Sequence, residues 1–153
     1  MKNPAVVLST CCLILLSSCK LEEKEGVFID KQLDLYYVSR GGQDLLDTAV
    51  AGSYNTDSIH MYEFRDGIKH EVVNRIDYPK GFLYLKNDLT GKYLIRIFPE
   101  TEVSILELNA STFDTIRCTL EITDRKFIIT SVLYNGLYHW DDMATPRALI
   151  VTK

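Results

Sequence analysis

The sequence lacks the short motifs that identify several common enzyme classes. It contains no G-x-S-x-G nucleophile elbow, no H-E-x-x-H zinc helix, no phosphate-binding P-loop and no S-x-x-K pair after Cys19. Each of these motifs holds a nucleophile, a metal ion or a phosphate group against fixed partners. No catalytic residue and no cofactor is therefore predicted from them.

The chain also lacks an excess of positive charge. Its 17 Lys and Arg residues are outnumbered by 21 Asp and Glu residues, which gives a formal net charge of −4. Surfaces that bind nucleic acid need clustered Lys and Arg to neutralise phosphates. The composition therefore argues against nucleic acid as a partner, and against a polybasic contact with a membrane surface.

No apolar run in the chain has the length of a membrane-spanning helix. Such a helix takes about 20 mostly apolar residues, and the run at 5–16 is roughly half as long. Lys2 precedes this run, and the small residues Ser17 and Ser18 follow it. A positive start, a short apolar segment and small residues at its end are typical of a secretory signal peptide. The sequence therefore predicts an exported protein.

The end of this segment, Leu16-Ser17-Ser18-Cys19, resembles the lipobox of bacterial lipoproteins. The resemblance implies that residues 1–18 are a signal peptide and that Cys19 receives a diacylglycerol. Cys19 would then be the first residue of the mature protein. Two or three acyl chains anchor a protein stably, whereas one binds only marginally. The implied partner is a membrane, and the implied location is a lipid anchor in the outer membrane, facing the periplasm or the cell surface.

Residues 19–26 are predicted to be a lipidated, flexible tether. They contain the acidic residues Glu22, Glu23 and Glu25. One interpretation is a solvated segment, because charge runs are commonly disordered. The other is a resemblance to the charged signal by which lipoproteins of the Bacteroidota reach the outer face of the outer membrane. The sequence leaves both interpretations open.

Few cysteines remain once the predicted processing is complete. Cys11 and Cys12 leave with the signal peptide and Cys19 carries lipid, so Cys118 is the single remaining thiol. An intramolecular disulfide is therefore excluded in the mature protein. Cys118 alternates with Ile116 on a strand pattern, which predicts a small buried apolar residue rather than a reactive thiol.

The apolar residues recur with a period of two rather than 3.6. Ile116, Cys118, Leu120 and Ile122 alternate with polar residues, which is typical of a half-buried strand. Turn residues separate such runs, and Asn135-Gly136 predicts a type I′ hairpin turn. We therefore expect an all-β fold: residues 27–153 form a single immunoglobulin-like β-sandwich of about seven to nine short, mainly antiparallel strands. Residues 41–57 are expected to be a long loop, with Leu45 and Leu46 tucked beneath it.

Several short motifs together resemble a group of small Bacteroidota lipoproteins that have no established activity. They are the lipobox, Asp44-Leu45-Leu46-Asp47, Asp66-Gly67, Tyr134-Asn135-Gly136 and Trp140. The resemblance runs over nearly the whole chain from Cys19. It implies an exported β-domain and supplies no catalytic residues.

The side chains that are candidates for catalysis, metal binding or ligand binding are scattered along the chain. His60 and His70 flank the Asp66-Gly67 turn, but two histidines without a third ligand do not predict a metal site. The adjacent Tyr36 and Tyr37 are expected to face opposite sides of a strand, so one of them could belong to a sugar-binding surface. The loop acids are Asp44, Asp47, Asp57, Asp141 and Asp142, and the strand acids are Glu63, Glu71, Glu102, Glu107 and Glu121.

Two classes of function follow from these observations. The first is a non-enzymatic binding or accessory module of the cell envelope that binds a partner protein or a glycan. The alternative is a small envelope hydrolase that uses loop carboxylates.

Replacement of Cys19 tests the predicted lipid anchor. We expect Cys19→Ala to block incorporation of a labelled fatty acid and to leave an unprocessed or mislocalised precursor, because the thiol is the lipid acceptor. Cys118→Ala serves as the matched control and should be labelled like the parent. Equal labelling of Cys19→Ala and the parent would refute the lipoprotein prediction.

Overall fold

The structure is a computed structural model that describes residues 26–141 and 147–153, and the side chains of 138–141 are not described. The predicted signal peptide, the predicted lipid acceptor Cys19 and most of the predicted tether lie outside the described residues, as does Asp142. The Trp140 side chain also lies outside the description.

The described residues form strands and almost no helix. The strands are β1 (Phe28–Asp30), β2 (Leu33–Val38), β3 (His60–Arg65), β4 (Ile68–Glu71), β5 (Phe82–Lys86), β6 (Tyr93–Ile97), β7 (Val103–Asn109), β8 (Thr112–Thr123), β9 (Lys126–Tyr134), β10 (Leu137–Asp141) and β11 (Ala148–Thr152). A single 3₁₀ turn, η2, covers Thr56–Ser58. The predicted all-β class is confirmed. The predicted number of strands is too low, because short exposed strands such as β1 carry no alternating pattern.

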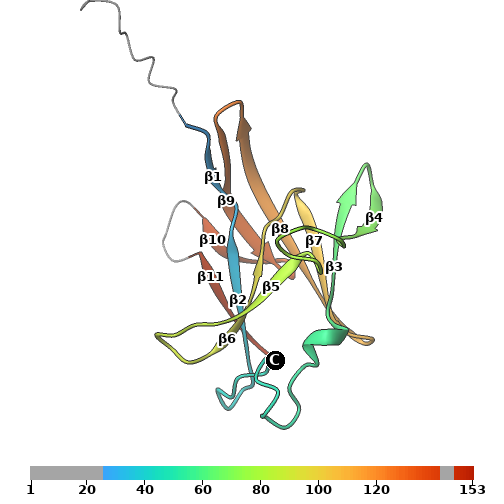
Figure 1. Ribbon diagram of the computed structural model, residues 1–153, viewed down its shortest axis with the longest axis vertical. Helices are drawn as coiled ribbons and strands as arrows, with labels where there is room; N and C mark the ends of the chain where they lie inside the picture. Colours follow the sequence, from blue (N-terminus) through green and yellow to red (C-terminus); the bar gives the residue numbers. More distant parts are fainter. Residues whose placement is uncertain (1–25, 142–146) are drawn as a thin grey trace, which may run out of the picture.

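The strands make two mixed sheets, which lie against each other in a sandwich-like arrangement (Figure 1). Sheet A has the order β1-β9-β8-β7-β3-β4, with β10 also paired to β9, and sheet B has the order β11-β2-β6-β5. Most pairs are antiparallel, but β1 runs parallel to β9 and β11 runs parallel to β2. The all-β, two-sheet arrangement therefore agrees with the prediction, while the immunoglobulin-like topology stays a prediction.

Two of the connections between the sheets start from one edge of β9. The other edge of β9 is occupied by β8, so β1 and β10 share the remaining one. β1 pairs with the start of β9 and β10 pairs with its end. β1 leads directly into β2, and β11 is the next described strand after β10, so both connections lead from sheet A to sheet B.

The core lies between the inward faces of the two sheets. Leu35 and Ile95 from sheet B and Leu106 and Ile116 from sheet A belong to one continuous apolar cluster. Cys118 joins this cluster as predicted, and its burial raises the pKa of its thiol to about 12. Ile122, expected on the same buried face, is 62% exposed. It lies near the tip of the β8–β9 hairpin, which extends beyond the rest of the sandwich in Figure 1.

The loop between β2 and β3 is closed by its own apolar residues, as predicted. Leu46 is completely buried, and Leu45 packs against the core. Asp44 fixes this arrangement because its carboxylate accepts hydrogen bonds from the backbone N–H groups of Leu46 and Tyr93, at 2.9 and 2.7 Å.

The predicted turn at Asn135-Gly136 is present. Asn135 has a φ of 48° and Gly136 a φ of 78°, as a type I′ turn requires, and Tyr134 pairs directly with Leu137. The Asn135 side chain also accepts a hydrogen bond from Thr115 N and donates one to Asp114 Oδ1, each at 2.7 Å. The turn therefore ties the end of β9 to β8 as well as reversing the chain.

Gly136→Val should destabilise the protein by roughly 1–3 kcal/mol, because a β-branched residue adopts a positive φ only with strain. Urea unfolding measures the change in free energy. Gly41→Val is the matched control and should have little effect, since an added Cβ meets only Ser39 Oγ at 3.6 Å and Gly41 has no positive φ. A wild-type midpoint for Gly136→Val would contradict this account of the turn.

Candidate functional sites: a charged cleft and a sheet-face groove

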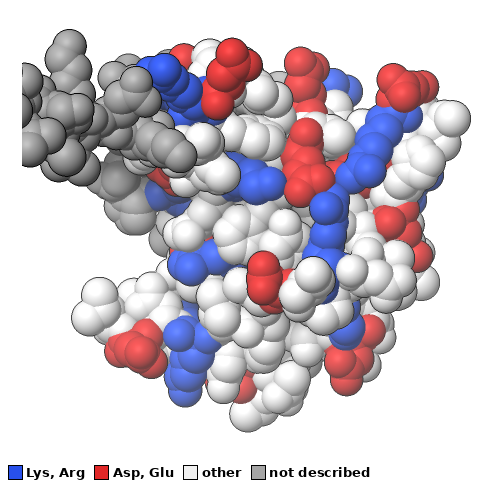
Figure 2. Space-filling model, turned by 45° about the horizontal axis from the view of Figure 1, so that its top comes forward, with Lys and Arg blue, Asp and Glu red and all other residues white. Residues whose placement is uncertain are grey.

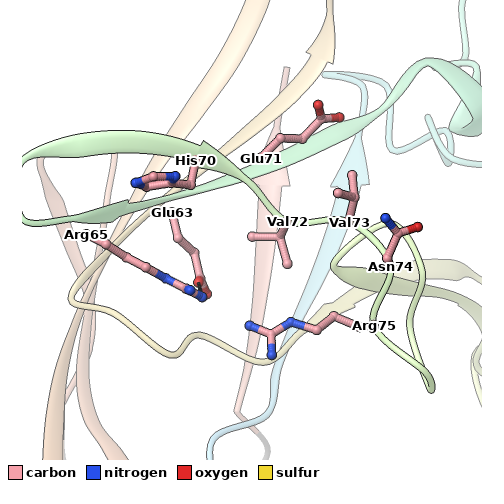
Figure 3. A pocket seen from close by; sticks show the side chains of 8 residues that line it. All are labelled: Glu63, Arg65, His70, Glu71, Val72, Val73, Asn74 and Arg75. Carbon is pink, nitrogen blue, oxygen red and sulfur yellow. Dashed lines mark hydrogen bonds and ion pairs between the residues drawn. The ribbon is translucent and has the colours of Figure 1, made fainter.

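The first candidate site is a cleft of about 450 Å³ beside the β3–β4 hairpin. Its walls come from β3, β4 and the segment that follows β4 (Figure 3). The lining residues are Glu63, Arg65, His70, Glu71, Val72, Val73, Asn74 and Arg75. In Figure 3 the side chains of Glu63, Arg65 and Arg75 extend to the same side of the hairpin, and Glu71 points to the other side. The cleft is therefore a charged site in which acids and bases face each other.

An ion-pair network crosses this cleft. Glu63 is 1% exposed, and its carboxylate contacts Arg65 at 3.1 Å and accepts a hydrogen bond from Glu100 N, also at 3.1 Å. Glu100 in turn contacts Arg75 at 2.5 Å, Lys31 at 3.2 Å and Arg65 at 3.6 Å. Sequence reasoning missed Glu100 because its partners lie in three separate segments, and no local pattern brings these together.

The network fixes the charge of Glu100. Burial alone would raise the pKa of this carboxyl, but the hydrogen bonds and charges of Arg75 and Lys31 outweigh burial and lower the pKa below its ordinary value. A carboxylate held ionised in this way accepts hydrogen bonds and is a poor proton donor. The cleft therefore suits structural pairing better than the general acid catalysis of a hydrolase.

The two histidines of the β3–β4 hairpin do not form a common site. His70 pairs with Glu63 across the hairpin, so it shares a face with that inward residue, whereas His60 lies on the opposite face of β3. His60 Nδ1 instead lies 2.7 Å from Glu71 Oε1. Within residues 26–141 and 147–153, no group of at least three His, Cys, Asp or Glu side chains is placed to hold a metal ion.

The loop acids proposed for hydrolysis are engaged in local structure. Asp47 accepts a hydrogen bond from Ala49 N, Asp44 holds Leu46 and Tyr93 as described above, and Asp57 pairs with Lys80 at 3.1 Å. Asp44 and Asp47 stabilise turns, which is the usual role of Asp in loops, whereas Asp57 forms an exposed ion pair. The structure does not gather them into one cleft.

The second candidate site is a groove of about 610 Å³ on the outer face of sheet B. We call it the sheet-face groove. Its floor comes from β2 and β11, and its wall is the β5–β6 loop. The lining residues are Asp34, Tyr36, Val38, Asn87, Leu89, Thr90, Lys92, Ala148 and Ile150. Most of the lining is aliphatic or aromatic, which is typical of binding sites.

Tyr36 forms the centre of this floor. Tyr37 is completely buried in the core, so the two tyrosines face opposite sides of β2 as predicted. The Asn87 amide donates a hydrogen bond of 2.7 Å to the Tyr36 hydroxyl, which ties the loop wall to the floor. Ile150 pairs beside Tyr36 on β11 and is 71% exposed, and Leu89 in the loop is 97% exposed. The sequence pointed to this site only through the adjacent tyrosines, which place one ring on an outer face; Leu89 and the loop wall were not predicted.

The surface charge is mixed. On the face shown in Figure 2, Lys and Arg residues are interspersed with Asp and Glu residues rather than gathered into one patch of a single sign. Over the described part of the chain, no helix combines the length and apolar character that a membrane span requires.

Comparisons with known proteins identify no relative of this chain. No family model matches it, and no match was found among curated proteins or among solved structures.

Glu100→Gln should lower the free energy of unfolding at neutral pH by on the order of 1 kcal/mol, because the cations around it lose their shared partner. The folded pKa of Glu100 is lowered, so its contribution is present above the unfolded value near 4.5 and is lost as the pH falls through the folded value. As the pH falls below about 4.5, the free energy of unfolding should therefore decrease less for the variant than for the parent.

Urea unfolding at a series of pH values measures this difference. Asp57→Asn is the control, because Asp57 in its pair with Lys80 is 91% exposed, and exposed pairs contribute little. If the free energy of unfolding of Glu100→Gln decreased with falling pH in the same way as that of the parent, the role of the network would be contradicted.

Proposed function

We propose that this protein is a lipid-anchored, non-enzymatic binding module of the cell envelope, and that the sheet-face groove binds an apolar segment of a partner protein. In this proposal Cys19 carries the lipid in the outer membrane, and the β-domain faces the periplasm or the cell surface. The immunoglobulin-like topology also stays part of the proposal. The observation that carries it is the exposed apolar lining of the groove.

The exposure of the groove supports binding. Leu89 and Ile150 stand in water at 97% and 71% exposure, on either side of the Tyr36 ring. Large apolar residues exposed together around a hollow are typical of interaction sites, since leaving them in water costs free energy that a partner recovers. The hydrogen bond from Asn87 to Tyr36 holds wall and floor together before a partner arrives, which reduces the ordering cost of binding.

The chemistry of the lining favours a protein over a glycan. A polysaccharide presents many hydroxyl groups that require hydrogen-bond partners, whereas Val38, Ala148 and Ile150 offer none through their side chains. The charged pair in the floor is already satisfied, because Arg96 contacts both carboxylate oxygens of Asp34 at 2.7 and 2.9 Å. Lys92 at the rim adds a positive charge, which suits an acidic residue next to the apolar segment.

The hydrolase alternative has weaker support. It requires loop carboxylates that converge on a substrate, and Asp44 and Asp47 instead hold backbone N–H groups of their own loop.

In vivo photo-cross-linking tests the proposal. A photoreactive amino acid at position 89, in cells that make the full chain, should yield one discrete protein adduct. The same probe at position 113 is the control, because Phe113 is similarly apolar and 66% exposed but lies on β8 in sheet A. Ile150→Asp, combined with the probe at 89, should reduce the adduct about tenfold, which corresponds to roughly 1.4 kcal/mol.

Two results would overturn the assignment. Equal adducts at positions 89 and 113 would show that the groove has no selectivity. Binding of a purified polysaccharide that is abolished by Ile150→Asp, without any protein adduct at 89, would identify a glycan as the occupant instead.

A further inference from the structure

A lysine and an aspartate meet inside the sandwich, at the end where β11 finishes. Lys153 follows β11, and its backbone N–H donates to Val38 O at 2.9 Å, so the pairing with β2 continues to this residue. Leu149 and Val151 point into the core, and the alternation of a strand gives Lys153 the same direction. Its Nζ atom lies 2.5 Å from Asp114 Oδ1.

Asp114 is a completely buried carboxylate in sheet A. It lies on β8, and its side chain has 0% exposure, against 22% for the side chain of Lys153. Besides Lys153, the Asn135 amide donates to Oδ1 at 2.7 Å. Among the described residues Oδ2 has no hydrogen bond of ordinary geometry, but the hydroxyls of Tyr37 and Tyr134 interact with the carboxylate as hydrogen-bond partners. Asp114 is therefore a buried carboxylate surrounded by donors, of which Lys153 is the cation.

Two tyrosines enclose the pair. The hydroxyls of Tyr37 from sheet B and Tyr134 from sheet A lie 3.3 Å apart, and Lys153 Nζ is 5.9 and 6.0 Å from their ring centroids. Burial, and then the charge of Asp114, raises the pKa of the Tyr37 hydroxyl well above its ordinary value. The pKa of Tyr134 is also raised, first by burial, so both hydroxyls keep their protons. Tyr54 closes the enclosure with an edge-on contact to Tyr37, at 6.0 Å between centroids.

The enclosure of Lys153 and Asp114 is not needed to form an ion pair, which can form equally well at the surface. Burying an ion pair has a large desolvation cost, and a buried ion pair often contributes no net stability. A primary amine held against a carboxyl group in a site shielded from water is, however, the geometry for amide formation, because fixed proximity replaces the entropy cost of bringing the groups together. We propose that Lys153 and Asp114 form an intramolecular isopeptide bond between Nζ and Cγ, which joins the two sheets covalently.

The reaction needs no added reagent. The Lys153 ammonium passes one proton to the Asp114 carboxylate, which leaves a neutral amine and a neutral acid. This proton goes to Oδ1, the oxygen that Nζ contacts. The Nζ lone pair attacks Cγ, and the carbonyl electron pair moves onto Oδ2. A second nitrogen proton passes to the hydroxyl at Oδ1, the C–Oδ1 bond breaks, and one water leaves. The product is a secondary amide, and nothing is oxidised or reduced.

The bond would stabilise the protein in the way that a disulfide does, and the described residues cannot form a disulfide. Cys118 is the one cysteine in the described ranges and is unpaired. The Lys153–Asp114 bond closes a loop across a sequence separation of 39 residues and lowers the entropy of the unfolded chain, as a disulfide does.

Peptide mapping of the full chain tests the inference. Trypsin cleaves after Arg96, Arg117 and Arg147, so it releases Asp114 in the peptide 97–117 and Lys153 in the peptide 148–153. In the folded wild-type protein we expect neither peptide alone. Mass spectrometry should find one branched peptide, lighter than the sum of the two by one water molecule.

Lys153→Arg is the matched control. It keeps the positive charge next to Asp114, but a guanidinium is not a nucleophile, so both peptides should appear separately. Recovery of both unlinked peptides from the folded wild-type protein would show an ion pair only and overturn the inference. A branched peptide that joins 148–153 to 127–147 and is lighter than their sum by one ammonia would place the bond on Asn135 and overturn the assignment to Asp114.

Discussion

The exclusion of water from two apolar sheet faces is the constraint on which the rest of this structure depends. Leu35 and Ile95 on one sheet need Leu106 and Ile116 on the other, because each face exposed alone would cost a large part of the folding free energy. The chain meets this constraint by crossing repeatedly between the two sheets. Several strands that are neighbours in sequence, such as β1 and β2 or β6 and β7, therefore lie in different sheets, whereas hairpins such as β3–β4 and β7–β8 stay within one sheet.

The same packing buries two carboxylates, and each of them is paired with cations. Glu63 is buried beside the β3–β4 hairpin and is neutralised by a network that extends to Glu100. Asp114 is buried between the ends of the sheets and meets Lys153. The first network includes exposed arginine and shapes a cleft, while the second is enclosed by tyrosine rings. This difference in access to water is why we assign ion pairing to one and covalent chemistry to the other.

The proposed binding site lies away from both networks, on the outer face of sheet B. In the proposed function, the lipid anchor would fix the location of the protein, and the sandwich would hold the apolar groove in shape. A covalent bond between the sheets would fit this role, since exported domains without disulfides depend on their cores alone.

The sequence by itself determined the all-β class, the burial of Cys118 and Leu46 and the Asn135-Gly136 turn. These properties follow from alternation and turn chemistry, which act over a few neighbouring residues. The predicted lipid anchor at Cys19 rests on an equally local pattern. Only the tertiary structure decided that His60 and His70 face opposite sides, that Glu100 pairs with three cations, that Leu89 and Ile150 line one groove and that Lys153 contacts Asp114. These contacts join residues far apart in the chain, and they depend on sheet order and strand register, which no local pattern encodes.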